Sequence, residues 1–82
     1  MVEIKNMEEL PMSSYNDFLQ VVDSLPKGTS FAVTYDWCKN QGLNLTPNMA
    51  KSWGKRFSTD YMYHNTVSRG KGSDNHHLYE KI

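Results

Sequence analysis

Apolar residues recur every three or four positions over residues 15–25, which predicts an amphipathic helix. Ser14 stands directly before this pattern and Asp17 follows three positions later, which is the spacing of a capping box at a helix start. Pro26 and Gly28 come after the pattern. Proline cannot continue a helix, and glycine accepts the positive φ that a tight turn requires, so we expect the helix to end there.

A second, shorter pattern follows. Residues 30–33 are partly β-branched or aromatic, which favours a brief strand. Thr34 is suited to cap a helix over residues 35–41, and Gly42 stands where a left-handed C-terminal cap belongs. We expect this helix to bury Trp37 together with Cys38.

The longest helical pattern begins at Thr46, a natural N-cap, with Pro47 at the first helical position, where the missing amide hydrogen costs nothing. The apolar positions at helical spacing are Met49, Ala50, Trp53 and Phe57. The polar positions on the opposite arc are Asn48, Lys51, Ser52, Lys55, Arg56 and Thr59. This third helix therefore has one face for the core and one continuous face of hydrogen-bond donors.

The pattern changes after the third helix. Residues 61–67 are rich in aromatic and β-branched side chains, residues 68–75 are dense in turn formers, and residues 76–82 alternate between apolar and polar. This predicts an antiparallel hairpin with a long, flexible, basic tip. We expect core packing from Met62 and from at least two of Tyr61, Tyr63 and Tyr79, whose other possible use is to stack on single-stranded bases.

With 82 residues the chain has the size of one domain, too small for a spacious enzyme cleft. Pro11 interrupts residues 1–12, which have no sustained apolar period, so we expect them to be an N-terminal extension to a domain over residues 13–82. The single cysteine, Cys38, excludes an intramolecular disulfide. No apolar run approaches the roughly 20 residues of a membrane span, and we expect a cytoplasmic protein.

The predicted order is helix, short strand, helix, turn, helix and hairpin. Over residues 14–82 this α+β order resembles a winged helix-turn-helix domain, as do Gly42 in the turn before the third helix and the basic, glycine-containing hairpin tip. The segments "LPKGTSF" and "SDNHHLY" are also similar to segments of small winged-helix proteins of Gram-positive bacteria and their phages. The resemblance implies a three-helix core, a sheet in which the strand after the first helix pairs with the hairpin wing, and double-stranded DNA as the partner.

The net charge of zero hides an asymmetry along the chain. Residues 1–36 hold six acids and two bases, whereas residues 37–82 hold three acids and seven bases. Such asymmetry is a recognised sign of a polyanionic partner, although an unevenly charged solvated surface gives the same counts. Composition alone therefore leaves both interpretations open.

The resemblance assigns roles to the third helix and to the wing. The implied groove-facing residues are Asn48, Lys51, Ser52, Lys55 and Arg56. Arg56 would grip a guanine edge or a phosphate, the two lysines would contact phosphates, and Ser52 and Asn48 would make neutral contacts. In the wing, Arg69 and Lys71 would follow the sugar-phosphate chain or enter the minor groove, with Asp74 weakening the patch.

Catalysis and metal binding are not expected. The candidate metal ligands are Cys38, His64, His76 and His77, but adjacent histidines on a strand point to opposite faces and Cys38 has no second cysteine nearby. No pocket or oxyanion site accompanies the thiol, so we expect neither enzymatic activity nor a cofactor.

Two functions remain after these exclusions. The first is a small DNA-binding regulator, or a phage or plasmid accessory factor. The second is a protein-interaction module of the same fold, such as a phage-type inhibitor of a host protein. The oligomeric state is left open.

Overall fold

The structure is a computed structural model and describes residues 11–72 and 76–82. Most of the predicted N-terminal extension and residues 73–75 of the predicted hairpin tip, with Asp74, lie outside these ranges. Within them the chain forms three α-helices and a three-stranded antiparallel sheet, so the predicted α+β class is confirmed. The elements are α2 (Tyr15–Ser24), β1 (Ser30–Phe31), α3 (Tyr35–Asn40), α4 (Pro47–Asp60), the 3-10 helix η1 (Tyr61–His64), β2 (Thr66–Lys71) and β3 (His77–Lys81).

The start of α2 follows the predicted capping box. The Asp17 amide donates to Ser14 Oγ over 3.2 Å, and the Ser14 amide donates to Asp17 Oδ2 over 2.8 Å. These two bonds satisfy amides that have no partner inside the helix. The helix then buries Tyr15, Phe18 and Val22 on one face.

The second helix buries only one of the two residues that it was expected to bury. Thr34 Oγ1 caps α3 by accepting from the Trp37 amide over 3.1 Å, and Gly42 has the expected positive φ of 89°. Cys38 is fully buried, whereas Trp37 is only half-buried, so the expectation for the tryptophan was wrong. Helical geometry turns the smaller Cys38 side chain into the core, while the Trp37 ring packs at the margin against Phe31, with centroids 5.1 Å apart.

The third predicted helix is α4, and its boundaries agree closely with the pattern. Thr46 Oγ1 accepts from the Met49 amide over 3.2 Å, and Pro47 occupies the first helical position. Ala50, Trp53 and Phe57 are buried and Met49 is half-buried. The hydrophobic stripe read from the sequence is therefore the face that holds α4 on the core.

The segment after α4 contradicts the predicted strand. Residues 61–64 form the 3-10 helix η1, which continues directly from α4, and β2 begins only at Thr66. Tyr61 lies one turn after Phe57 and packs on Tyr79, with ring centroids 5.5 Å apart. Asn65 then adopts the left-handed conformation (φ 53°), which asparagine tolerates better than most residues, and turns the chain into β2.

The sheet has the order β1-β3-β2. Strand β3 pairs with both neighbours, so that Tyr79 lies opposite Phe31 on one side and Ser68 on the other. The register is irregular between Ser68 and Lys71, where Gly70 has a φ of 79°. Arg69, Gly70 and Lys71 thus belong to an extended strand, whereas the sequence analysis placed them in a flexible tip.

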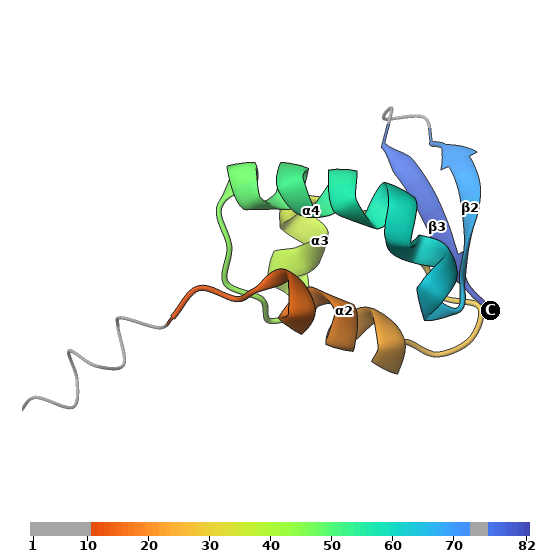
Figure 1. Cartoon of the computed structure of the whole chain (residues 1–82), viewed down its shortest axis with the longest axis horizontal. Helices are drawn as coiled ribbons and strands as arrows, with labels where there is room; N and C mark the ends of the chain where they lie inside the picture. The colour runs from red at the N-terminus through yellow and green to blue at the C-terminus, as the bar shows by residue number, and fades with distance from the viewer. Residues whose placement is uncertain (1–10, 73–75) are drawn as a thin grey trace, which may run out of the picture.

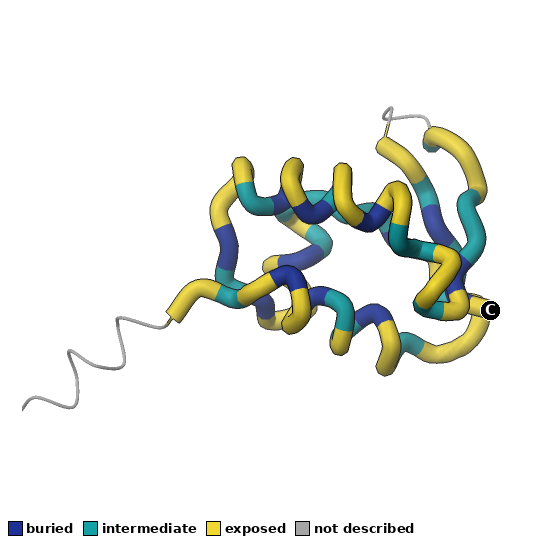
Figure 2. Tube along the Cα trace, viewed as in Figure 1, coloured by how far each residue is buried: buried dark blue, intermediate teal, exposed yellow. Residues whose placement is uncertain are grey.

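An aromatic cluster joins the helices to the sheet. Phe57 of α4 is fully buried, and its ring centroid lies 5.3 Å from Phe18, 5.8 Å from Phe31 and 4.9 Å from Tyr79. Figure 1 shows the β2–β3 hairpin at the C-terminal end of α4, extending past α4 on the side away from α2. Figure 2 shows that the outward side of α4 is exposed while its inward side is buried. The hairpin therefore rises beside the exposed face of α4.

Candidate nucleic-acid interface

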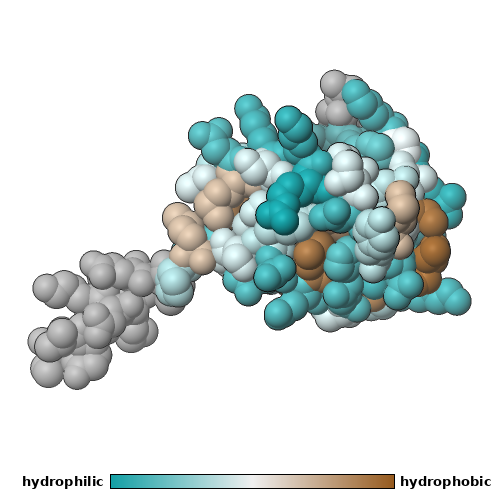
Figure 3. Space-filling view, viewed as in Figure 1, coloured by the Kyte–Doolittle hydropathy of each residue, from teal (hydrophilic) through white to brown (hydrophobic). Residues whose placement is uncertain are grey.

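The polar face of α4 is an uninterrupted surface of donors and cations. All five residues assigned to it are exposed: Asn48, Lys51, Ser52, Lys55 and Arg56. From Pro47 to Thr59 the helix carries no acid, and Asp60 is its first carboxylate. Figure 3 shows hydrophilic side chains projecting from this side of the molecule. The face has positive charge without an internal counter-charge.

Lys51 and Lys55 carry the clearest unneutralised charge. They stand four residues apart on one helix face, so their ammonium groups are neighbours. Within the described ranges, neither lysine makes an ion pair. Two adjacent like charges repel each other slightly, and an anion placed between them relieves that repulsion.

Arg56 lies at the flank of this face, where it contacts α2. Its guanidinium carbon is 4.1 Å from the centroid of the Tyr15 ring, within the range of a cation–π contact. The Tyr15 hydroxyl donates to Asp60 Oδ2 over 2.9 Å. Burial, together with this bond to a carboxylate, raises the pKa of Tyr15 well above its ordinary value. Arg56 is thus an exposed cation that is also packed, and its removal would disturb the α2–α4 contact as well as the surface charge.

The hairpin cations are less available than the sequence implied. Arg69 Nε donates to Glu80 Oε1 on the neighbouring strand over 2.8 Å, so a carboxylate already neutralises this arginine. Lys71, at the end of β2, is exposed and makes no ion pair with any described residue. Of the two cations assigned to the wing, Arg69 is the one that a described carboxylate neutralises.

Lys81 is removed from the surface altogether. It is buried, and its Nζ lies 3.5 Å from the Asp23 carbonyl oxygen and 3.4 Å from that of His64. These carbonyls lie near the C-terminal ends of α2 and η1, where a cation is favourable. This base therefore ties β3 to two helices and adds little to the exposed positive charge.

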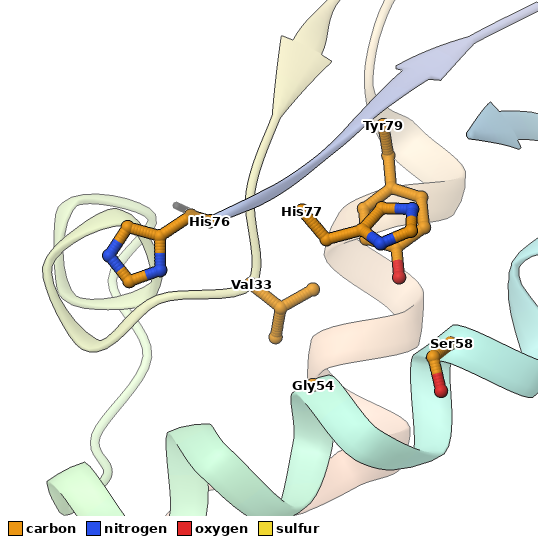
Figure 4. A pocket seen from close by; sticks show the side chains of 6 residues that line it. All are labelled: Val33, Gly54, Ser58, His76, His77 and Tyr79. Atoms are coloured by element: carbon orange, nitrogen blue, oxygen red, sulfur yellow. The ribbon is translucent and has the colours of Figure 1, made fainter. Parts of the chain in front are cut away.

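Sequence reasoning missed a groove between α4 and β3. A cavity of about 150 Å³ is lined by Val33, Gly54, Ser58, His76, His77 and Tyr79 (Figure 4). A second cavity of about 260 Å³ shares Val33 and His76 with the first and extends along Pro47, Ala50 and Lys51. Both cavities are lined by residues of α4 and are neighbours through Val33 and His76, and we refer to the two together as the groove.

The two histidines of this groove correct the argument about opposite faces. His76 precedes β3, so the alternation of side chains along a strand does not apply to it, and both histidines line the same cavity. Figure 4 shows the His77 ring against Tyr79, above α4, and His76 on the other side of Val33. The signal in the sequence was the His-His pair itself, which was considered only as a metal ligand.

Other candidate chemistry is accounted for by packing. Cys38 is fully buried, and burial raises the pKa of its thiol to about 11, so it remains neutral. His64 is paired with Asp23, with Nδ1 2.9 Å from Oδ1. Over residues 11–72 and 76–82 no three His, Cys, Asp or Glu side chains are grouped so that they could hold a metal ion.

The aromatic and apolar side chains beyond α4 agree with expectation only in part. Tyr79 is buried and Tyr61 half-buried, as two of the three tyrosines were expected to be. Tyr63 is 77% exposed and Met62 is 60% exposed, so the assignment of Met62 to the core was wrong. Both belong to η1, none of whose residues is buried.

Comparisons with protein families, with curated proteins and with solved structures found no match to this chain. None of the helices in the described part of the chain has the length and apolar character needed to span a membrane.

Proposed function

We propose that this chain is a winged-helix DNA-binding domain that inserts α4 into the major groove and lays the β2–β3 hairpin along the phosphate backbone. The observation that carries the proposal is the exposed face of α4, which is free of acids up to Asp60 and on which Lys51 and Lys55 form no ion pair with a described residue. An α-helix fits the major groove of B-DNA, and unpaired lysines are suited to its phosphates.

The topology supports the same function. Strand β1, which follows the first helix, pairs with β3, the second strand of the hairpin. A winged-helix domain has a small sheet with this pairing. The hairpin stands beside the exposed face of α4 (Figure 1). Lys71 is the last residue of β2 and is exposed, so a duplex seated on the helix would also meet this lysine. The protein then acts without catalysis or cofactor, as a bacterial or phage regulator or accessory factor.

The test is a titration of labelled mixed-sequence duplex DNA followed by fluorescence anisotropy at about 50 and 200 mM salt. If Lys51, Lys55, Arg56 and Lys71 each neutralise a phosphate, the logarithm of affinity falls against the logarithm of salt with a slope of about −4. The double variant Lys51→Gln/Lys55→Gln should lose most of the affinity and reduce the slope by about two.

A matched control separates the helix face from overall charge. Lys27→Gln removes the same charge as Lys55→Gln, but Lys27 lies in the turn between α2 and β1. Lys55→Gln should weaken binding and Lys27→Gln should leave it nearly unchanged. Equal losses in the two variants would mean that α4 has no special role.

A protein-interaction module is the second candidate, and one observation favours it. Met62, Tyr63 and Ile82 are exposed, and the Ile82 amide donates to the Asn65 carbonyl over 2.8 Å, which brings the C-terminal residue beside the end of η1. An exposed apolar group of this kind is typical of protein contact surfaces. Absence of any DNA binding at about 50 mM salt would favour this alternative, because phosphate contacts are strongest at low salt.

A further inference from the structure

The groove between α4 and β3 lies next to the proposed DNA-binding face. Lys51 of α4 lines the same cavity as His76. Lys71 of β2 lies opposite His77 in the sheet, so a cation borders the histidines on the hairpin side as well. A DNA strand that passes from α4 to the hairpin must cross this groove.

We propose that the groove receives a backbone phosphate of the bound duplex, and that protonated His76 and His77 contact that phosphate, so that DNA affinity increases as the pH falls. This inference rests on the proposed DNA-binding function. A neutral imidazole has one N–H donor and no charge, whereas an imidazolium has two donors and a positive charge. Protonation therefore adds both charge and a hydrogen bond to a phosphate contact.

The surroundings of the histidines favour a response to an anion. Both are exposed, and none of the described carboxylates lines either cavity. Of the described titratable or charged side chains, Lys51 and Tyr35 line the second cavity with His76, and His77 and Tyr79 line the first cavity with it. The His77 ring stacks on Tyr79, with ring centroids 4.6 Å apart, and Lys71 lies opposite His77 on the neighbouring strand. Ser68 Oγ contacts His77 Nε2.

A phosphate brought next to an imidazole favours the charged, protonated form of the ring. DNA binding and proton uptake are then linked, and each promotes the other to the same degree. Histidine gains its proton between about pH 8 and pH 5, whereas the phosphodiester stays singly charged throughout this range. The protein rather than the DNA supplies the pH dependence.

The experiment measures duplex affinity by anisotropy at about pH 6 and about pH 8, at fixed ionic strength. The wild-type protein should bind about five- to tenfold more tightly at the lower pH, and its salt slope should become steeper there by about one to two. His76→Gln/His77→Gln should bind like wild type at the higher pH and lose the gain at the lower one. Glutamine keeps hydrogen-bonding capacity without a titratable charge.

His64→Gln is the matched control, because His64 is paired with Asp23 and lines neither cavity. It should keep the full pH response. Circular dichroism of each variant checks the fold, and an NMR titration of the wild-type imidazole resonances gives an independent result. Bound DNA should keep His76 and His77 protonated to higher pH and leave His64 unaffected.

The outcomes distinguish this inference from the function on which it rests. Equal wild-type affinity at both pH values, or an unchanged pH response in the double variant, overturns the role of the histidines while DNA binding stands. Absence of wild-type binding at low salt at either pH overturns both proposals.

Discussion

Helix α4 and the segment that follows it, residues 61–72, are adjacent in the chain but specified in different ways. The conformation of α4 is encoded within its own sequence, by Thr46 and Pro47 at its start and by an apolar stripe along one face. Residues 61–72 depend on the rest of the molecule: Tyr61 packs on Tyr79, and the register of β2 is fixed by β3. The comparison shows that local chemistry sets helix boundaries, whereas tertiary contacts decide where an aromatic run becomes a strand.

The two regions also carry their positive charge differently. On α4 the lysines have no ion pair within the described structure, whereas on β2 Arg69 is held by Glu80. A cation without a protein partner keeps its full attraction for a phosphate, and a paired cation must first exchange one anion for another. On the proposed function, the helix should therefore contribute more to DNA affinity than the hairpin does.

The largest effect should come from Phe57→Ala, which removes the ring that joins both regions. Phe57 is fully buried and packs on Phe18, Phe31 and Tyr79. We expect a loss of about 3–5 kcal/mol in the free energy of unfolding, measured by chemical denaturation. Tyr63→Ala, which truncates an exposed aromatic ring of η1, should change stability by less than about 0.5 kcal/mol. Similar losses in both variants would show that the segment after α4 contributes to the core as fully as α4.

A smaller effect should follow from changing Asn65, the residue that turns η1 into β2. Its φ of 53° is unfavourable for a β-branched side chain. Asn65→Val should lower the free energy of unfolding by about 1–2 kcal/mol, whereas Asn65→Gly should be tolerated because glycine adopts this conformation freely. Thermal denaturation of the two variants measures the difference. If valine is tolerated as well as glycine, the left-handed turn is not required.

The contrast between local sequence and tertiary contacts also explains which parts of the fold can be predicted from the sequence. The capping residues Ser14 and Thr46 act on amides three positions away, so sequence alone identifies both helix starts. The prediction of a strand from residue 61 onward was wrong, because the strand propensity of single residues takes no account of tertiary contacts. A signal was nevertheless present: Tyr61 follows Phe57 by four residues and continues the helical stripe.

The candidate site likewise has one part that the sequence predicts and another that depends on tertiary contacts. Helical periodicity places the polar residues of α4 on one face without any tertiary information. The partner of Arg69 is Glu80, and finding it requires the register of β2 on β3, which includes an irregularity. To predict the groove would require the whole tertiary structure, because β3, α4 and Val33 come together only in the folded chain. The sequence predicts which side chains share one face of a single helix. It does not predict which side chains from different elements come into contact.

Each region contains a glycine, and the two should respond in opposite directions to alanine. A Cβ on Gly54 would lie 3.7 Å from the Val33 carbonyl oxygen, an ordinary contact, and alanine is the better helix former. Gly54→Ala should raise the free energy of unfolding by about 0.5–1 kcal/mol. Gly70 in β2 has a φ of 79°, so Gly70→Ala should lower it by a similar amount, about 1 kcal/mol. Paired urea denaturation curves measure both, and a gain from Gly70→Ala would contradict the left-handed conformation in β2.

The smallest effect tests whether the ion pair on the hairpin withholds charge from DNA. Removal of the carboxylate in Glu80→Gln leaves Arg69 unpaired, and affinity for duplex DNA should rise by about threefold at low salt. Arg69→Gln removes a cation that is already neutralised, so its loss should be smaller than that caused by Lys55→Gln. Exposed ion pairs contribute only about 0–1 kcal/mol, so neither change should alter folding appreciably. Anisotropy titrations of the three variants give the order. A loss from Arg69→Gln as large as that from Lys55→Gln would mean that the arginine leaves Glu80 when DNA binds, and that helix and hairpin contribute equally to the interface.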